Sequence, residues 1–126
     1  MLNNRRFLGA WELISFESRR ADGTVVRSWG LDPLGMIMWD ESGHMSAQLG
    51  PRDGSSYVAY FGTLEADDSP EGTLTHHVAG ASGESLRTDQ VRTFRFLSGD
   101  ELVLSPPPAP DGTVSTVTWR RFRPGA

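Results

Sequence analysis

Short apolar runs alternate with turn-forming residues along the whole chain. The runs are rich in Val, Ile, Thr, Phe and Trp, and clusters such as Asp22-Gly23, Ser42-Gly43 and Ser98-Gly99-Asp100 separate them at short intervals. This punctuation is typical of an all-β sandwich or barrel. The pattern predicts strands near 7–19, 24–29, 36–40, 44–49, 60–67, 73–80, 90–97, 102–105 and 113–122. Only 55–60 could hold a helical turn.

The number and ends of these segments favour closure into a barrel. A meander with antiparallel neighbours closes only with an even number of strands, so we expect about eight, with 24–29 or 102–105 a kink or continuation. Trp11 lies early in the first segment and Arg121 late in the last. A guanidinium stacked over an indole would cap one end there through a cation–π contact. The sequence predicts a closed antiparallel up-and-down β-barrel, with 1–126 as a single domain.

Alternation along the strands indicates which side chains face the interior. In the hairpin 35–49, a turn centred on Glu41-Ser42 pairs Met38 with Met45 and places Met36 on the same face. Methionine is a pliable lining for an irregular apolar guest, although filling a core is its more common role. A bulge at Gly43 would shift this register by one residue.

Polar side chains are also expected inside. Even positions of 73–80 and 90–97 point inward, which sets His76 beside Arg92 or one pair away. A polar group aimed into an apolar cavity costs several kcal/mol unless it is paired, so these two are the candidate functional and catalytic residues. The same pattern brings further residues to the interior: Gln90, Tyr60, Phe94, Phe96 and Trp119.

Each of these two residues has a structural alternative. His76 could be a core histidine that bonds to Tyr60 or Gln90. Arg92 could fork onto a ligand carboxylate or enolate-like oxygen. Its alternative is a buried salt bridge, for which the sequence offers the carboxylates Glu65, Glu17 and Asp89.

Composition removes several function classes. The 126 residues are 37% hydrophobic with a net charge of −4, which argues against a nucleic-acid partner. No apolar run approaches the roughly 20 residues that span a bilayer. No apolar stretch of the signal-peptide kind follows Met1–Arg6. With no cysteine, the cytoplasm is the expected compartment, and thiolate chemistry is excluded.

The basic residues and histidines narrow the chemistry further. All 12 basic residues are arginine, so lysine-based Schiff-base and phosphate chemistry lacks its usual residue. His76 and His77 are adjacent on a strand and point to opposite faces, whereas one metal needs ligands that converge. We therefore expect no metal site and no cofactor.

Several blocks of the sequence resemble the bacterial and fungal lipocalin-like domain family. The resemblance implies a small calycin-type barrel related in shape to lipocalins, and it carries over no catalytic residue set. The segment 50–57 departs from the pattern by being short and polar, so a lid or crossing helix is expected to be absent there. The matching blocks are Leu8–Phe16, Asp22–Thr24, Asp32–Gly35, Gly43–Leu49, Ala59–Thr63, Gly72–Val78, Thr88–Arg92 and Thr118-Trp119.

Three functional hypotheses follow. The first is a small-molecule-binding protein that holds a mostly apolar or amphiphilic ligand with an anionic or carbonyl group. The second is a cofactor-free isomerase or cyclase acting on a secondary metabolite, in which His76 shuttles a proton and Arg92 stabilises negative charge. The third is a filled barrel whose outer strands form a homodimer. A cavity on the order of 300 Å³ with a mouth favours the first two. The expected ligand-binding residues are His76, Arg92, Gln90, Tyr60, Met36, Met38, Met45, Phe94, Phe96 and Trp119.

Overall fold

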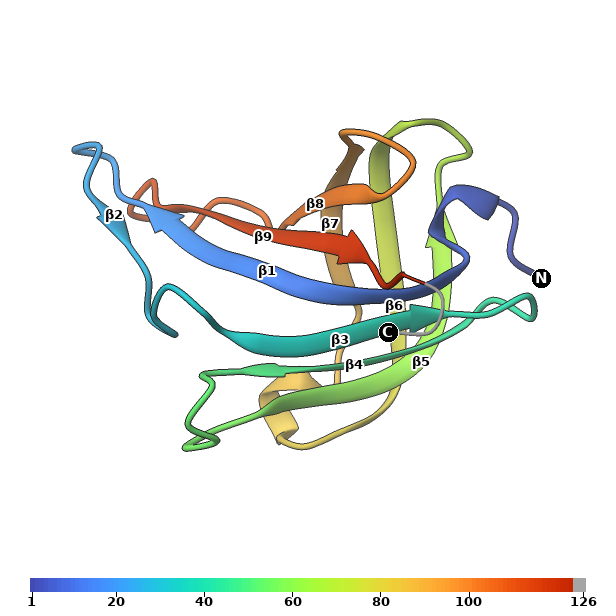
Figure 1. Cartoon of the computed structure of the whole chain (residues 1–126), viewed down its shortest axis with the longest axis horizontal. Helices are drawn as coiled ribbons and strands as arrows, with labels where there is room; N and C mark the ends of the chain where they lie inside the picture. The colour runs from blue at the N-terminus through green and yellow to red at the C-terminus, as the bar shows by residue number, and fades with distance from the viewer. Residues whose placement is uncertain (124–126) are drawn as a thin grey trace.

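The alternating apolar runs form nine antiparallel strands in the computed structural model, which describes residues 1–123 (Figure 1). Two single helical turns accompany them, η1 (Arg5–Phe7) and η2 (Glu84–Leu86). Neither turn is long or apolar enough to cross a membrane. The strands are β1 (Gly9–Arg19), β2 (Val25–Val26), β3 (Leu34–Trp39), β4 (His44–Gly50), β5 (Val58–Ala66), β6 (Glu71–Ala81), β7 (Gln90–Phe96), β8 (Glu101–Ser105) and β9 (Val114–Arg121).

Eight of these strands close a barrel and the ninth is an addition to its rim. Strands β1 and β3 to β9 follow one another around the wall, and β9 pairs with β1 to close it. Strand β2 pairs only with the far end of β1, through Ser18 and Arg19. The prediction of a closed antiparallel barrel of about eight strands is therefore confirmed, and the extra segment is 24–29. The segment 55–60, the only one that the pattern allowed for a helical turn, has none, because residues 58–60 belong to β5; the helical turns lie at η1 and η2 instead.

The predicted contact between Trp11 and Arg121 is present at one end of the barrel. The guanidinium carbon of Arg121 lies 4.1 Å from the centroid of the Trp11 ring. The same guanidinium donates hydrogen bonds to the carbonyls of Leu8, Arg6 and Gly99. These bonds tie β9 to the segment that precedes β1 and to the turn that precedes β8, so one arginine fixes this end of the wall.

Gly9 allows the close approach of the Arg121 side chain. Its φ is +117°, a backbone conformation that residues with a side chain rarely adopt. An added Cβ would lie 3.0 Å from Nη1 of Arg121. A larger residue at this position would therefore strain the backbone and displace the guanidinium.

Phe7 fills the barrel interior at the end where Trp11 and Arg121 meet, called the closed end below. Its ring centroid lies 5.0 Å from those of Trp39 and Phe94, and 4.9 Å from that of Phe96. Phe7 itself is fully buried. This half of the barrel is consequently a packed aromatic core and not a cavity.

Asn4 holds the segment that carries Phe7. Its buried side chain accepts from the backbone N–H of Arg6 and donates to the carbonyls of Asp67 and Ser69, at 2.9 and 3.0 Å. One short amide thus caps η1 and pins it to the β5–β6 turn. Phe7, the aromatic residue that fills this end of the barrel, is therefore positioned by Asn4 and η1 and not by a strand.

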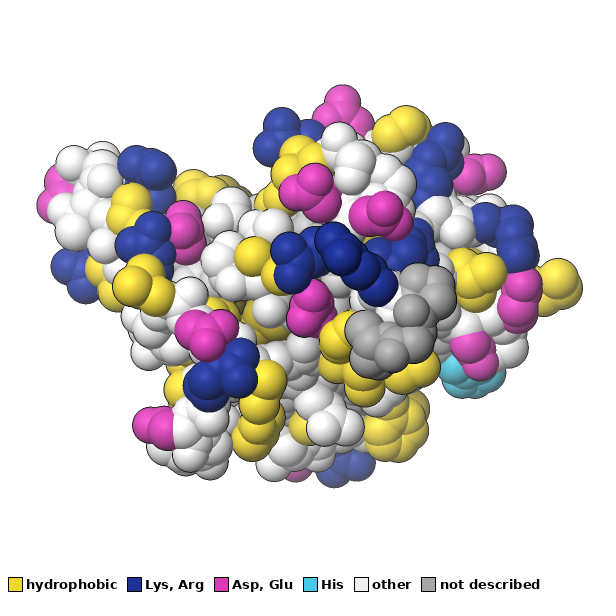
Figure 2. Space-filling view, viewed as in Figure 1, with side chains coloured by type: hydrophobic (Ala, Val, Ile, Leu, Met, Phe, Trp, Pro, Cys, Tyr) yellow, Lys and Arg dark blue, Asp and Glu magenta, His cyan; other side chains and the backbone are white. Residues whose placement is uncertain are grey.

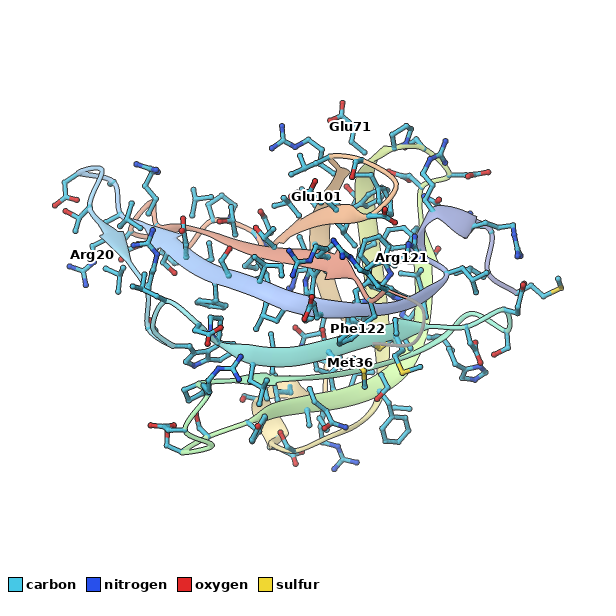
Figure 3. All side chains as sticks on the ribbon, in the orientation of Figure 1. Arg20, Met36, Glu71, Glu101, Arg121 and Phe122 are labelled. Carbon is cyan, nitrogen blue, oxygen red and sulfur yellow. The ribbon has the colours of Figure 1, made fainter. Side chains whose placement is uncertain are left out.

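The β3–β4 hairpin has a register one residue away from the predicted one. Trp39 pairs with Met45 and Ile37 with Ala47, so Met36 and Met38 project outward, with 39% and 45% of their surface exposed. Figure 3 labels Met36 on β3. The expectation that these two methionines line the interior is wrong; Met45 alone of the three is buried.

The turn chemistry explains this shift. Asp40 pairs with His44 across a three-residue loop that ends at Gly43, whose φ is +86°. The Asp40 carboxylate accepts from the backbone N–H groups of Ser42 and His44. A left-handed glycine at the end of a three-residue loop forms a bulge, which reverses the inward and outward positions of β3.

Basic and acidic side chains are interspersed on the face shown in Figure 2. Arg120 pairs with Glu12 at 2.9 Å, and Arg27 pairs with Glu17 at 2.8 Å. Such exposed pairs contribute little to stability. Each of these two pairs neutralises one arginine at the surface.

Candidate functional site

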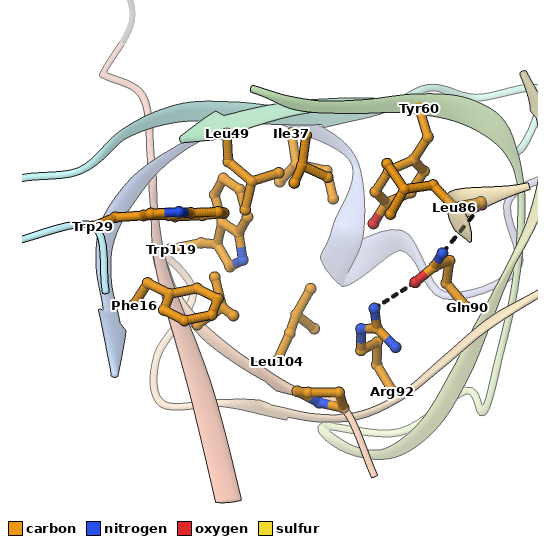
Figure 4. A pocket seen from close by; sticks show the side chains of 13 residues that line it. Phe16, Trp29, Ile37, Leu49, Tyr60, Leu86, Gln90, Arg92, Leu104 and Trp119 are labelled. Atoms are coloured by element: carbon orange, nitrogen blue, oxygen red, sulfur yellow. Dashed lines mark hydrogen bonds between the residues drawn. The ribbon is translucent and has the colours of Figure 1, made fainter. Parts of the chain in front are cut away.

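The half of the barrel opposite Phe7 contains a pocket of about 260 Å³. Its lining comes from β1, β3 to β5 and β7 to β9, and from residues outside these strands. Trp29 precedes β3, Leu86 belongs to η2 and Pro106 follows β8; Figure 4 labels the first two. The lining is mostly apolar: Phe16, Trp29, Ile37, Leu49, Val58, Tyr60, Leu86, Gln90, Arg92, Leu104, Pro106, Val117 and Trp119.

An aromatic pair forms one side of this pocket. The ring centroids of Phe16 and Trp29 lie 4.6 Å apart, with the planes tilted by 38°. Simple alternation from Trp11 and Leu13 would have pointed Ser15 inward. A bulge at Ile14 shifts the pairing with β9 by one residue and turns Phe16 inward instead.

Arg92 is the charged residue of the pocket wall. It is partly buried, as expected for an inward position of β7, and burial lowers its pKa. Its Nη2 donates to the Oε1 of Gln90, and its Nη1 donates to the carbonyl of Val91 at 2.8 Å. Gln90 in turn donates to the carbonyl of Leu86 at 3.2 Å, so the two side chains hold each other and η2 (Figure 4).

The structural alternative for Arg92, a buried salt bridge, is absent among the residues described. Glu65 and Asp89 both contact His77, at 2.8 and 3.2 Å, on the outer face. Glu17 pairs with Arg27. Each carboxylate that could have neutralised Arg92 is therefore engaged elsewhere. The guanidinium faces an apolar pocket with neutral hydrogen-bond acceptors only.

His76 lies behind the pocket wall and not in it. It pairs with Gln90 across β6 and β7, and Leu74 pairs with Arg92, so of the two expected placements, beside Arg92 or one pair away, the second is present. Its ring is fully buried; Nε2 accepts from the indole N–H of Trp39 at 3.1 Å, and Nδ1 lies 3.4 Å from the hydroxyl of Tyr60. The structure favours the alternative of a core histidine over direct ligand contact.

Burial also removes His76 from acid–base chemistry near neutral pH. It lowers the pKa of His76 to about 3, and the positive charges of Arg92 and His77 act in the same direction. The ring is therefore neutral at pH 7. A role as proton shuttle, the expectation for an isomerase or cyclase, does not fit this environment.

Tyr60 carries its hydroxyl into the pocket from β5 (Figure 4). Burial raises the pKa of this phenol, and the nearby charge of Arg92 opposes the rise without cancelling it. Tyr60 is thus a neutral phenol over the physiological range. Its hydrogen can be donated, and Arg92 lines the same pocket.

Trp119 presents an unsatisfied donor at the pocket. It is 2% exposed, and its Nε1 has no hydrogen-bond partner among the described residues. A buried N–H without a partner costs about 1–3 kcal/mol. In Figure 4 the indole nitrogen lies on the side of the ring that faces the pocket, across from Arg92.

Three other expected lining residues lie outside the pocket. Met45, Phe94 and Phe96 point inward as predicted, but they pack in the closed half around Phe7. Alternation identifies the inner face of a strand; it does not tell which end of the barrel is filled. No cluster of three or more potential metal-ligating side chains occurs in residues 1–123.

Three comparisons place this geometry among known proteins. Residues 8–55 match the family model described as a lipocalin-like domain. No curated protein matches the chain. A de novo designed fluorescence-activating β-barrel is similar, with a TM-score of 0.51, 20% identity, and coverage of 97% of this chain and 100% of that one. A redesigned β-barrel, mFAP0, bound to DFHBI, has a TM-score of 0.47 and 18% identity, covering 92% and 99%.

At 20% identity the fluorescence-activating barrel shows a shared fold alone. The family match covers the first strand, the rim addition and the β3–β4 hairpin, the segments in which the sequence resemblance begins. Together with the eight-stranded antiparallel barrel, the match over residues 8–55 confirms that the chain resembles the lipocalin-like domain family.

Proposed function

We propose that this barrel binds a small, mostly apolar molecule whose carboxylate or carbonyl oxygen lies against Arg92. The observation that carries the proposal is a partly buried guanidinium with no carboxylate partner among the described residues, at the wall of an otherwise apolar pocket. Burying a charge is costly unless it is paired. A guest with an acceptor oxygen would supply the missing partner through one or two charge-assisted hydrogen bonds.

The size of the pocket limits the guest. At about 260 Å³ it lies just below the lower end of the range of about 300–1,000 Å³ typical of drug-sized ligands. Phe16, Trp29 and Trp119 offer aromatic faces around this space. A flat molecule of one or two rings suits both the volume and the aromatic walls.

Binding is favoured over catalysis by the chemistry of the lining. The pocket wall holds a phenol, a primary amide and a guanidinium, but no carboxylate or imidazole. An isomerase or cyclase that moves a proton would need a base, and His76 is both sheltered behind Tyr60 and neutral with a pKa of about 3. The remaining donors can hold an oxygen, which is what a binding site requires.

Titration calorimetry with a matched pair of probes tests this function. The probes are 2-naphthoate, which has a carboxylate, and 2-methylnaphthalene, which has the same rings without one. We expect the wild-type protein to bind 2-naphthoate at least tenfold more tightly, and Arg92→Gln to lose that preference. Arg95→Gln is the control, because Arg95 lies on the exposed face of the same strand. If Arg92→Gln and Arg95→Gln bind 2-naphthoate with equal affinity, the proposal is overturned.

Native mass spectrometry of the protein purified from its own host is the complementary measurement. A retained small molecule with a carboxylate or carbonyl would identify the guest class directly. A retained guest without any acceptor oxygen would contradict the role of Arg92.

A further inference from the structure

The direction of a buried hydrogen-bond chain can be assigned from its first member, Trp39. An indole N–H can only donate, and Trp39 is fully enclosed in the core. It donates to Nε2 of His76 at 3.1 Å. That nitrogen must therefore carry its lone pair, and the single proton of a neutral imidazole must lie on Nδ1.

The tautomer of His76 in turn fixes the role of Tyr60. The Nδ1–H of His76 faces the Tyr60 oxygen at 3.4 Å, a long contact in which the phenol oxygen accepts. The His76 ring is fully buried and neutral, so its Nε2 stays unprotonated and keeps accepting from Trp39. The hydroxyl hydrogen of Tyr60 must then point away from His76. The Tyr60 hydroxyl makes no other hydrogen bond in residues 1–123, and it projects into the pocket.

The other polar groups at the pocket are donors as well. Arg92 has no acceptor atom, and the one acceptor oxygen of the Gln90 side chain is already bonded to it. The Gln90 amide donates to the Leu86 carbonyl. The unpaired Nε1–H of Trp119 is a third donor, on the opposite wall. Among the described residues that line the pocket, the side chains thus offer mainly N–H and O–H groups, and the side-chain oxygens of Gln90 and Tyr60 each already accept one hydrogen bond.

We propose that this donor-rich pocket selects guests whose oxygens only accept, namely carboxylates, ketones or enolates, and discriminates against hydroxyl groups, with Tyr60 as the donor that Trp39 orients through His76. The inference rests on the proposed function, because it concerns the guest of the same pocket. A hydroxyl group could accept from Tyr60 or Arg92, but its own hydrogen would meet only side-chain oxygens that already accept from Arg92 or His76, and it would be poorly satisfied after burial. By the usual penalty for such a group, affinity falls about tenfold to a hundredfold.

Nitrogen NMR tests the tautomer without any ligand. Long-range ¹⁵N–¹H correlation spectra at pH 7 distinguish the protonated from the unprotonated imidazole nitrogen of each histidine. We expect His76 to be the Nδ1–H tautomer, with Nε2 unprotonated. The exposed rings of His44 and His77 are internal references for solvent-accessible imidazoles in the same sample. An Nε2–H tautomer or an imidazolium at His76 would overturn the relay.

A matched ketone and alcohol test the selectivity. The probes are 2-acetylnaphthalene and 1-(2-naphthyl)ethanol, which have the same skeleton and are both neutral. We expect the wild-type protein to bind the ketone at least tenfold more tightly in titration calorimetry, and Tyr60→Phe to reduce that ratio severalfold. Tyr57→Phe is the control, because Tyr57 is the other tyrosine of the chain and is exposed.

The outcomes separate the two proposals. If the ketone and the alcohol bind equally well to the wild-type protein, the selectivity fails while the binding function stands. If Tyr60→Phe and Tyr57→Phe behave alike, the assignment of Tyr60 fails even where the ketone is preferred. If 2-naphthoate and both neutral probes fail to bind, the proposed function itself fails, whatever tautomer His76 adopts.

Discussion

His76 and His77 are consecutive in β6, yet their rings lie on opposite sides of the barrel wall. His76 is enclosed beneath Trp39 and Tyr60, and burial lowers its pKa to about 3. His77 lies outside between Glu65 and Asp89, whose hydrogen bonds raise its pKa. Protonation of His76 therefore destabilises the folded barrel, whereas protonation of His77 stabilises it.

The pH dependence of stability should separate these two histidines. Between about pH 6.5 and pH 3 the unfolded chain protonates His76 while the native barrel does not. Stability therefore falls with decreasing pH through this window, by about 1 kcal/mol for each pH unit. For His77 the folded pKa is the higher one, so its small contribution is full below pH 6.5 and lost as pH rises through the folded pKa. The side chain is largely solvated, which keeps that contribution small.

Urea unfolding at several pH values from 4 to 8 measures both effects. We expect His76→Gln to flatten the slope between pH 4 and 6.5, even if it lowers stability throughout. His77→Gln should keep that slope and remove only a weak decline above pH 6.5. Carboxylates that titrate in the acid range are common to both variants. An unchanged acid slope in His76→Gln would contradict the assignment of a buried, neutral imidazole.

Arg121→Lys should weaken the closed end of the barrel although it keeps the positive charge. Lysine lacks the planar fork that stacks on Trp11 and bonds three carbonyls at once. We expect a loss of about 1–3 kcal/mol in the free energy of unfolding. The control is Arg120→Lys, because Arg120 makes only an exposed pair with Glu12, and its loss should stay below about 0.5 kcal/mol. Similar losses in both variants would show that the stacked geometry contributes nothing.

The sequence predicted the wall of this barrel well wherever its strands are regular. The inward positions of His76 and Arg92 follow from a period of two, and the contact of Trp11 with Arg121 follows from closure of the first strand on the last. The sequence leaves open whether His76 lies beside Arg92 or one pair away. The exclusion of a salt bridge at Arg92 could not be predicted, because residue type does not reveal that Glu65, Glu17 and Asp89 have other partners.

The contents of the barrel were harder to predict because bulges and loops decide them. The left-handed Gly43 turned Met36 outward, and the bulge at Ile14 turned Phe16 inward. Trp29 and Leu86 reach the pocket from connections, where alternation has no meaning. Where the strand register shifts by one residue, alternation assigns inward residues to the outer face and outward residues to the interior. The only sign of such a shift in the sequence is a turn with glycine and aspartate at the right positions.

Replacing Trp119 by Phe should lower the free energy of unfolding less than replacing Trp39 by Phe. Both indoles are fully buried, and a change to Phe removes a similar volume at each position. The N–H of Trp39 bonds to His76, whereas that of Trp119 has no partner among the described residues. We expect Trp39→Phe to lower the free energy of unfolding by about 1–3 kcal/mol more than Trp119→Phe, because only the former strands a polar partner. Urea denaturation without added ligand measures the difference; a larger loss in Trp119→Phe would mean that its N–H is satisfied in solution.

Phe7→Ala should convert the packed half of the barrel into a cavity. The ring contacts Trp39, Phe94 and Phe96, and removing a buried phenyl group costs about 3–5 kcal/mol. Phe61→Ala is the control, because Phe61 is 56% exposed and should lose far less. An apolar cavity of this kind stays dry and takes small aromatic molecules, so benzene should raise the melting temperature of Phe7→Ala and leave that of Phe61→Ala unchanged. A melting temperature of Phe7→Ala equal to that of the wild-type protein would mean that Phe7 does not fill the barrel in solution. In that case the binding pocket would extend through the whole interior, and its guest would be larger than one or two rings.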